Sequence, residues 1–119
     1  MNRDLKTRSK LFAHDCVKIA LSLPQTYLGN HVRNQLVRSS TSVAANYRAA
    51  QLGQSKRSFI AKLSIVIEEA DECVFWMEFL IDEGLLSRET CAVVLKEAGE
   101  LTAIFVTSRK TAEKTDNRG

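Results

Sequence analysis

Four consecutive hydroxyl side chains, residues 39–42, are the part of the sequence that most resembles a reactive site. They lie in the stretch LVRSSTSVAANYRAAQ, which contains no Gly or Pro and is expected to be helical. A serine becomes a nucleophile only when a general base holds it in one direction, whereas four successive helical positions point in all directions. Hydroxyls inside helices commonly bond the carbonyl one turn back. We therefore predict that this run serves close packing, and that Asn46, at the edge of the core, fixes packing register.

The two histidines suggest a second chemistry, because four-helix bundles can hold two metal ions through Glu residues and Glu-x-x-His motifs. Leu11 and Leu28 stand where this motif needs Glu, three residues before His14 and His31. The pair His14 and Asp15 has no nucleophile at a defined position. There is also no phosphate-binding glycine loop and no dinucleotide fingerprint. We therefore expect no metal, no cofactor and no enzymatic activity.

The composition is typical of one globular domain built from long helices. The 119 residues are 45% hydrophobic and 26% charged, with a single Pro and five Gly. Cys16, Cys73 and Cys91 are widely separated and form no C-x-x-C pattern, so we expect buried free thiols. The charged first residues lack a signal-peptide core, and no apolar run approaches the ~20 residues of a membrane span. We expect a cytoplasmic protein.

Apolar spacing predicts four helices. The first covers about residues 6–23, with Leu11, Phe12, Cys16, Ile19, Ala20 and Leu23 at the core positions. The second begins near a cap at Asn30 and ends at Gly53, the third covers 55–83 before Gly84, and the fourth runs from a cap at Ser87 to about Ala112. Short connections favour an antiparallel up-down-up-down four-helix bundle. The domain is expected to cover residues 1–112, followed by a frayed polar tail at 113–119.

The third predicted helix has two apolar faces. At about 100° per residue, one face holds the expected core residues, namely Phe59, Leu63, Val66, Ile67, Ala70, Val74, Met77 and Ile81. The opposite face combines acidic residues with large apolar residues, most of them aromatic. It consists of Ile65, Glu68, Glu72, Phe75, Trp76 and Phe79. Three aromatic residues on the outside of an isolated bundle would be unusual. We predict that this face binds another subunit; the alternative is that some of the rings lie at the edges of the core.

The second predicted helix has an outer face made of small side chains and two arginines. Its core positions are Val32, Leu36, Ser39, Val43, Tyr47 and Ala50, and its outer positions are Asn34, Arg38, Thr41, Ala45 and Arg48. Small side chains allow close approach, and arginine binds carboxylate or phosphate. The outer face therefore fits either the acidic aromatic face of a neighbouring subunit or a nucleic-acid backbone. The subunit contact would be head-to-tail, which closes into a ring or continues as a filament.

The charge is unevenly distributed along the chain, whose net charge is +3. Residues 1–57 contain ten Lys and Arg against two Asp and Glu, a net of +8, and no acidic residue stands between Asp15 and Glu68. Such a basic segment favours nucleic-acid binding, although no sequence-reading motif accompanies it. The candidate residues are Arg33, Arg38, Arg48, Lys56 and Arg57. The alternative for Arg33, Lys56 and Arg57 is ordinary solvated surface.

The stretches QLVRSSTSVAANYRAA and KRSFIAKLSIVIEEADECVFWMEFLIDEGLL resemble the four-helix-bundle family related to proteins encoded within intervening sequences of bacterial 23S ribosomal RNA. The resemblance covers roughly residues 23–86. Gln35, Arg38, Ser42 and Asn46 stand where the family pattern has the same residue types. The family ending Asn-Ile-Ala-Glu-Gly reads Asn-Tyr-Arg-Ala-Ala here, at residues 46–50, so its Glu and Gly are missing.

The resemblance implies a four-helix bundle that assembles into a ring, with five copies as the expected number, and no established enzymatic activity. Similar proteins in diversity-generating retroelements are basic accessory proteins that bind nucleic acid and a reverse transcriptase, which implies an RNA-associated role by analogy. We therefore expect a non-catalytic homo-oligomeric scaffold, with an RNA- or DNA-binding accessory module as the alternative. Neither a membrane nor a small-molecule substrate is expected as a partner.

Overall fold

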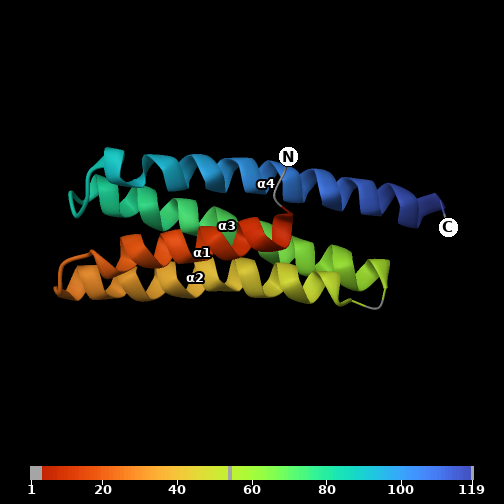
Figure 1. Ribbon diagram of the computed structural model, residues 1–119, viewed down its shortest axis with the longest axis horizontal. Coiled ribbons are helices and arrows are strands. Elements are labelled where there is room, and N and C mark those ends of the chain that lie inside the picture. The colour runs from red at the N-terminus through yellow and green to blue at the C-terminus, as the bar shows by residue number, and fades with distance from the viewer. Residues whose placement is uncertain (1–3, 54, 119) are drawn as a thin grey trace.

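Four α-helices and no β-strand are found in the described part of the chain, residues 4–53 and 55–118. In this computed structural model the helices are α1 (Leu5–Leu21), α2 (Tyr27–Gln51), α3 (Lys56–Asp82) and α4 (Arg88–Arg118). In Figure 1, α1 runs to the left-hand end of the bundle, α2 returns to the right, α3 runs left again and α4 returns. The helices pack lengthwise into a body of 52 × 28 × 21 Å. The predicted all-α class with four helices is confirmed.

Polar caps and one glycine set the boundaries of α3 and α4. The hydroxyl of Ser55 accepts a hydrogen bond from the amide of Ser58 at 3.1 Å, and that of Ser87 accepts one from the amide of Thr90 at 3.2 Å. Each cap satisfies an amide that the first helical turn leaves without a backbone partner. Gly84, after α3, has a φ of 72°, a left-handed conformation that favours glycine. The predicted cap at Ser87 and the predicted left-handed glycine at Gly84 are therefore confirmed.

The start of α2 differs from the prediction. The helix begins at Tyr27, and its cap is Thr26, whose hydroxyl accepts a hydrogen bond from the amide of Gly29 at 3.0 Å. Asn30, the predicted cap, lies inside the first turn. A Cβ at Gly29 would lie 2.0 Å from the carbonyl oxygen of Pro24. Only glycine therefore allows α2 to begin so soon after the end of α1.

Arg33 ties the end of α1 to α2. Its Nε donates to the carbonyl oxygen of Ala20 at 3.2 Å, and its Nη2 donates to those of Leu23 and Pro24 at 2.6 and 3.3 Å. Its Nη1 donates to the side-chain oxygen of Asn30. The carbonyl oxygens of Ala20 and Pro24 also accept backbone N–H bonds, from Leu23 and Thr26, so the guanidinium is an additional donor to these two and a donor to the Leu23 carbonyl. All three guanidinium nitrogens of Arg33 are thus engaged within the chain.

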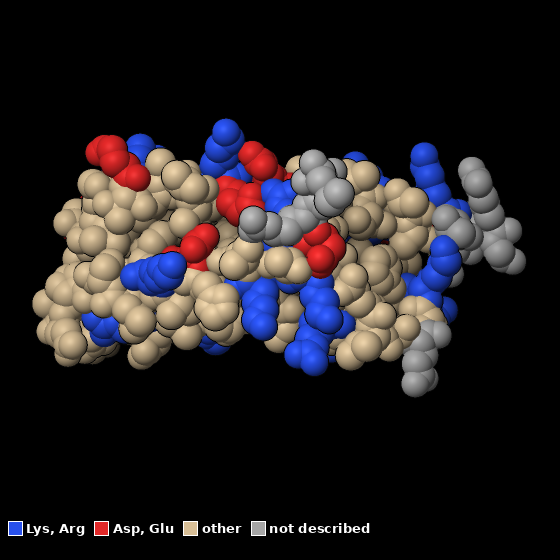
Figure 2. Space-filling model, in the orientation of Figure 1, with Lys and Arg blue, Asp and Glu red and all other residues tan. Residues whose placement is uncertain are grey.

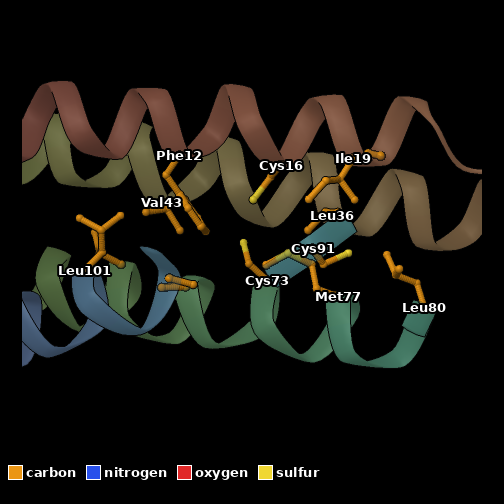
Figure 3. Close-up of a cluster of buried hydrophobic side chains, with 14 of the residues drawn as sticks. Phe12, Cys16, Ile19, Leu36, Val43, Cys73, Met77, Leu80, Cys91 and Leu101 are labelled. Carbon is orange, nitrogen blue, oxygen red and sulfur yellow. The ribbon is translucent and has the colours of Figure 1, made fainter. Parts of the chain in front are cut away.

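The core lies along the inner faces of all four helices, and part of it is drawn in Figure 3. Every α2 residue predicted for the core is buried: Val32, Leu36, Ser39, Val43, Tyr47 and Ala50. On α1 the prediction also holds, except at Leu11, which is 40% exposed. Leu11 is wrongly placed because it stands beside the buried stripe, where residue type alone does not distinguish a core position from its neighbour.

The buried stripe of α3 is rotated from the predicted one. Leu63, Val66, Ala70 and Met77 are buried as predicted, whereas Phe59, Ile67, Val74 and Ile81 are only partly buried. Cys73 and Leu80 take two of the innermost positions, each with 0% exposure. The helix contacts α2 on one side and α4 on the other, so its innermost line points between these two helices. The partly buried residues flank that line and cover the edge of the core.

The three cysteines are buried free thiols, as predicted. Figure 3 shows Cys16, Cys73 and Cys91 in the same region of the core. Cys73 Sγ donates to the hydroxyl of Ser39 at 3.4 Å. Hydrogen bonding to Cys73, together with burial, raises the pKa of the Cys16 thiol, and burial raises that of Cys91. Both thiols therefore stay protonated at neutral pH and act as small apolar side chains.

α1 is the shortest helix, with 17 residues, and it leaves one end of the bundle uncovered. In Figure 1 it begins part-way along the bundle, whereas α2, α3 and α4 continue to the right. α4 extends to Arg118, past Ala112, where the sequence predicted its end. The uncovered part consists of the end of α2, the start of α3 and the C-terminal part of α4. This part is called the open end below.

Candidate interaction surface

The hydroxyl run of α2 is occupied with local hydrogen bonds. Ser39 Oγ donates to the carbonyl oxygen of Gln35 at 2.8 Å, and Thr41 Oγ1 donates to that of Val37 at 2.7 Å. Ser40 Oγ also donates to the Val37 carbonyl, at 3.3 Å. These bonds reach back one helical turn, as expected for hydroxyls inside a helix. The predicted bonds to the carbonyl one turn back are therefore present, and Ser39 and Ser40 are buried.

The motif residues Gln35, Ser42 and Asn46 bond within α2. Asn46 Nδ2 donates to the Ser42 carbonyl oxygen at 3.0 Å and to the Ser42 hydroxyl at 2.9 Å. Gln35 Oε1 accepts from Arg38 Nε at 3.3 Å. Asn46 is partly buried at the edge of the core, so its amide has the local partner that a half-buried polar group needs.

Arg38 forms a cluster of ion pairs between α2 and α3. Its Nη1 lies 3.1 Å from a carboxylate oxygen of Glu69, and its Nη2 bonds the carboxylate of Glu72. Hydrogen bonding to Glu72 raises the pKa of Arg38. Burial alone would raise the pKa of Glu72, but hydrogen bonds from Trp76 and Arg38 outweigh it and lower the pKa below its ordinary value. The contact between Arg38 and Glu72 that the sequence suggested between subunits is therefore present within one chain.

Three aromatic rings of α3 contact one another beside this cluster. The Phe75 and Trp76 centroids lie 4.9 Å apart in an edge-to-face arrangement, and the Phe75 and Phe79 rings stack at 5.9 Å. Trp76 Nε1 donates to Glu72 Oε2 at 3.1 Å. The centroids of the His31 ring of α2 and the Trp76 ring lie 5.4 Å apart in an edge-to-face arrangement. The six predicted residues Ile65, Glu68, Glu72, Phe75, Trp76 and Phe79 are called the aromatic ridge below.

The ridge is partly core edge and partly exposed surface. Trp76 and Phe79 are half-buried and pack against the core, as the alternative interpretation of the sequence required. Phe75, however, is 52% exposed and Ile65 is 38% exposed. Glu68 is also exposed and has no ion pair among the described residues. The ridge therefore presents apolar area and negative charge to its surroundings.

The outer face of α2 is exposed as predicted, but its two arginines differ. Thr41, Ala45 and Arg48 are exposed. Arg48 lies ten residues from Arg38, roughly 15 Å along the helix at 1.5 Å per residue, and has no ion pair within the described part of the chain. The structure therefore does not bring these two arginines together.

A groove at the open end was not predicted from the sequence. Its volume is ≈ 970 Å³, and it lies between the end of α2, the start of α3 and the C-terminal part of α4. It is lined by Ala50, Gln51, Gly53, Ser55, Lys56, Phe59, Ala103, Ile104, Thr107, Ser108, Thr111 and Ala112. The groove exists because α1 begins too late to cover these residues, so only the packed structure reveals it.

Among the side chains that the structure describes, those of residues 4–53 and 55–114, no group of three or more His, Cys, Asp or Glu is placed to hold a metal ion. In the same residues, no helix combines the length and apolar character needed to cross a bilayer. The surfaces that remain to be explained are the aromatic ridge, the groove and the exposed basic residues.

Comparison with known proteins gives the family. Residues 2–107 match the model of the 23S rRNA-intervening sequence protein family, and the chain belongs to this family. The crystal structure of a protein of unknown function from the S23 ribosomal protein family of Bacteroides thetaiotaomicron is similar, with a TM-score of 0.84 and 31% sequence identity. The match covers 90% of this chain and 99% of that chain. Among curated proteins, none matches the chain.

Proposed function

We propose that the protein is a non-catalytic cytoplasmic scaffold whose antiparallel four-helix bundles self-associate through the aromatic ridge. The contact is head-to-tail and closes into a ring, for which the family resemblance suggests five copies. The observation that carries the proposal is the exposure of Phe75, which is 52% exposed while stacked on Phe79 and bordered by acidic side chains. Exposed aromatic patches of this kind mark interaction sites on folded domains.

Energetics support burial of the ridge against another subunit. Fully burying a phenylalanine side chain is worth roughly 1.5–3 kcal/mol relative to leaving it exposed. Phe75 is also held by Trp76 and Phe79, so little side-chain freedom remains to be lost on association. The acidic residues beside the rings would then select a partner surface of opposite charge.

Light scattering on a sizing column tests the proposal, with nucleic acid removed and at physiological salt. The wild-type protein is expected to elute as a defined multiple of 13.3 kDa. Phe75→Glu should reduce it to a single chain without loss of helicity in circular dichroism, because this side chain is largely outside the core. Trp76→Glu is a less clean variant, since Trp76 is half-buried.

Val93→Glu is the matched control, because Val93 is 79% exposed on α4, outside the ridge. It places the same charge on an exposed apolar position and should leave the assembly unchanged. A wild-type monomer, or an assembly that persists in Phe75→Glu, would reject self-association through the ridge.

A second candidate function is nucleic-acid binding through basic residues near the open end. Arg48, Lys56 and Arg57 are exposed and have no ion pair among the described residues, which favours this candidate. Arg33 and Arg38 contribute less, because their guanidinium groups are bonded within the chain. Each phosphate contact releases counterions, so binding should weaken steeply as salt rises.

Gel shifts at low salt with structured RNA, single strands and duplex DNA test this candidate. A Lys56→Ala, Arg57→Ala double variant should weaken binding and reduce its salt dependence. Lys18→Ala, at an exposed position on α1, is the control. Absence of binding to all three probes at low salt would remove the candidate.

A further inference from the structure

The groove at the open end continues the position of α1. In the rest of the bundle, α1 contacts both α2 and α4 and fills the space between them. Beyond the start of α1, no other helix in the described part of the chain takes its place against those two helices, and the groove lies there, with the start of α3 among its lining. A bundle of four helices therefore has only three at this end. A helix from outside the chain would complete the arrangement.

The walls of the groove suit close approach of such a helix. The α4 wall consists of small or aliphatic residues on one side of the helix, Ala103, Ile104, Thr107, Ser108, Thr111 and Ala112. The opposite wall includes Ala50 and the partly buried ring of Phe59. Small side chains let another backbone come near, and the ring supplies apolar area to cover.

The rim of the groove is basic. Lys56 lines it, and Arg48 is three residues before the lining residue Gln51, on the same side of α2. On α4, Lys110 and Lys114 are three residues beyond the lining residues Thr107 and Thr111, at the edge of the stripe that lines the groove. Figure 2 shows blue side chains at the right-hand end of the molecule, where the groove lies. The occupant should therefore be acidic.

The acidic side chains around Phe75 have the complementary character. Glu68, Asp71 and Glu78 are exposed, and they form no ion pair among the described residues. Asp71 and Glu78 are neighbours of Phe75, since they are four and three residues away on the helix, whereas Glu68 lies on the same side two turns before it. Phe59, which faces the groove, lies on nearly the opposite side of α3 from the ridge at about 100° per residue. A single chain therefore cannot bring ridge and groove together, but two chains can.

We propose that the groove at the open end receives the aromatic ridge of a second copy, with Lys56, Arg48 and Lys110 facing the neighbour's Glu68, Asp71 and Glu78. This inference rests on the proposed self-association and names the surface that the ridge contacts. Because ridge and groove are different surfaces, every copy uses both, and the contact repeats head-to-tail. The groove also supplies basic partners for the ridge in place of Arg38, which is bonded to Glu69 and Glu72 of its own chain.

Filling the groove tests the inference. Ala103→Trp places a large ring at an exposed position in the groove and should convert the assembly to single chains in light scattering, with helicity unchanged. Ala92→Trp is the matched control, because Ala92 is exposed on the same helix near its other end. It should leave the assembly intact.

Zero-length cross-linking provides a second measurement that does not depend on a variant. Unlabelled and ¹⁵N-labelled wild-type protein are mixed, and a carbodiimide joins lysine amines to nearby carboxylates as amides. Mass spectrometry should find Lys56 or Lys110 joined to Glu68, Asp71 or Glu78 in peptides that combine the two isotopes, which proves that two copies contributed.

The outcomes separate the inference from the proposed function. Phe75→Glu could dissociate the assembly while Ala103→Trp does not and no mixed-isotope peptide joins groove to ridge. In that case the groove is not the surface that the ridge contacts, and self-association through the ridge still stands. If the wild type is a single chain, both are rejected. Dissociation by Ala103→Trp but not by Ala92→Trp, together with the mixed-isotope peptides, supports the inference.

Discussion

The covered part of the bundle and its open end are made of the same three long helices, yet they differ in how their polar groups are used. Where α1 is present, arginines are bonded within the chain: Arg8 to Glu97 of α4, Arg33 to the end of α1, and Arg38 to α3. At the open end, Arg109 donates to the Ser64 hydroxyl at 3.3 Å, but Arg48, Lys56 and Lys110 are exposed and form no ion pair among the described residues. The difference indicates that one part of the molecule is folded for stability and the other is available for contact.

The core packing should show the largest difference between the two parts. Phe12 of α1 is 1% exposed in the covered part. Phe12→Ala should therefore lower the free energy of unfolding by about 3–5 kcal/mol, because the transfer free energy of the ring is lost and an enclosed cavity is left behind. Phe59 is only partly buried beside the open groove, so Phe59→Ala should cost about 1–2 kcal/mol.

Urea unfolding on a Phe75→Glu background measures both changes, because association would otherwise add to the apparent stability. Equal costs for the two variants would show that the open end is as tightly packed as the covered part, and would remove the basis of the comparison.

Every α2 residue predicted for the core is buried, although Gly29 and Ser40 are buried too and were not predicted. The α2 positions from Val32 to Ala50 follow from local periodicity, which needs no knowledge of the other helices. The role of Arg33 depends on where α1 ends, and the need for Gly29 depends on the nearby Pro24 carbonyl, so neither could be read from spacing. The groove likewise depends on the length of α1 relative to its neighbours.

The partial success with the ridge has the same cause. Residue type and projection placed Phe75, Trp76 and Phe79 on one face, and the structure brings these rings into contact. The projection could not distinguish Trp76 and Phe79, which cover the edge of the core, from Phe75, which is exposed. It also could not show that Arg38 reaches Glu72 within its own chain, because helix order and crossing decide that contact.

The arginines provide a smaller test of the comparison. Arg33→Ala removes hydrogen bonds to the carbonyl oxygens of Ala20, Leu23 and Pro24, and should lower the free energy of unfolding by about 1–2 kcal/mol, the size of a lost helix cap. Arg48→Ala, the matched control at an exposed position, should change it by less than about 0.5 kcal/mol.

Both arginine variants can be measured by urea unfolding on the Phe75→Glu background. If Arg48→Ala proved as destabilising as Arg33→Ala, Arg48 would have a structural role. The interpretation that basic residues at the open end are available to bind a partner would then be wrong.

The ion pair of Arg38 with Glu72 should show the smallest effect, and pH separates it from packing. The pKa of Glu72 is lowered in the folded chain from the ordinary value of 4.5. A lowered carboxyl pKa adds stability that is fully present above pH 4.5 and is lost as the pH falls through the folded value. Because Arg38 is 49% exposed, the contribution should stay below about 1 kcal/mol.

Glu72→Gln should therefore lower the free energy of unfolding slightly at pH 7, and the difference from wild type should shrink as the pH is lowered below 4.5. Glu68→Gln, at an exposed ridge position with no ion pair among the described residues, is the control and should have little effect on an isolated chain at either pH. A Glu72→Gln effect that is the same at both pH values would mean that Glu72 contributes through packing with Trp76. The covered part would then owe less to its internal ion pairs than the geometry indicates.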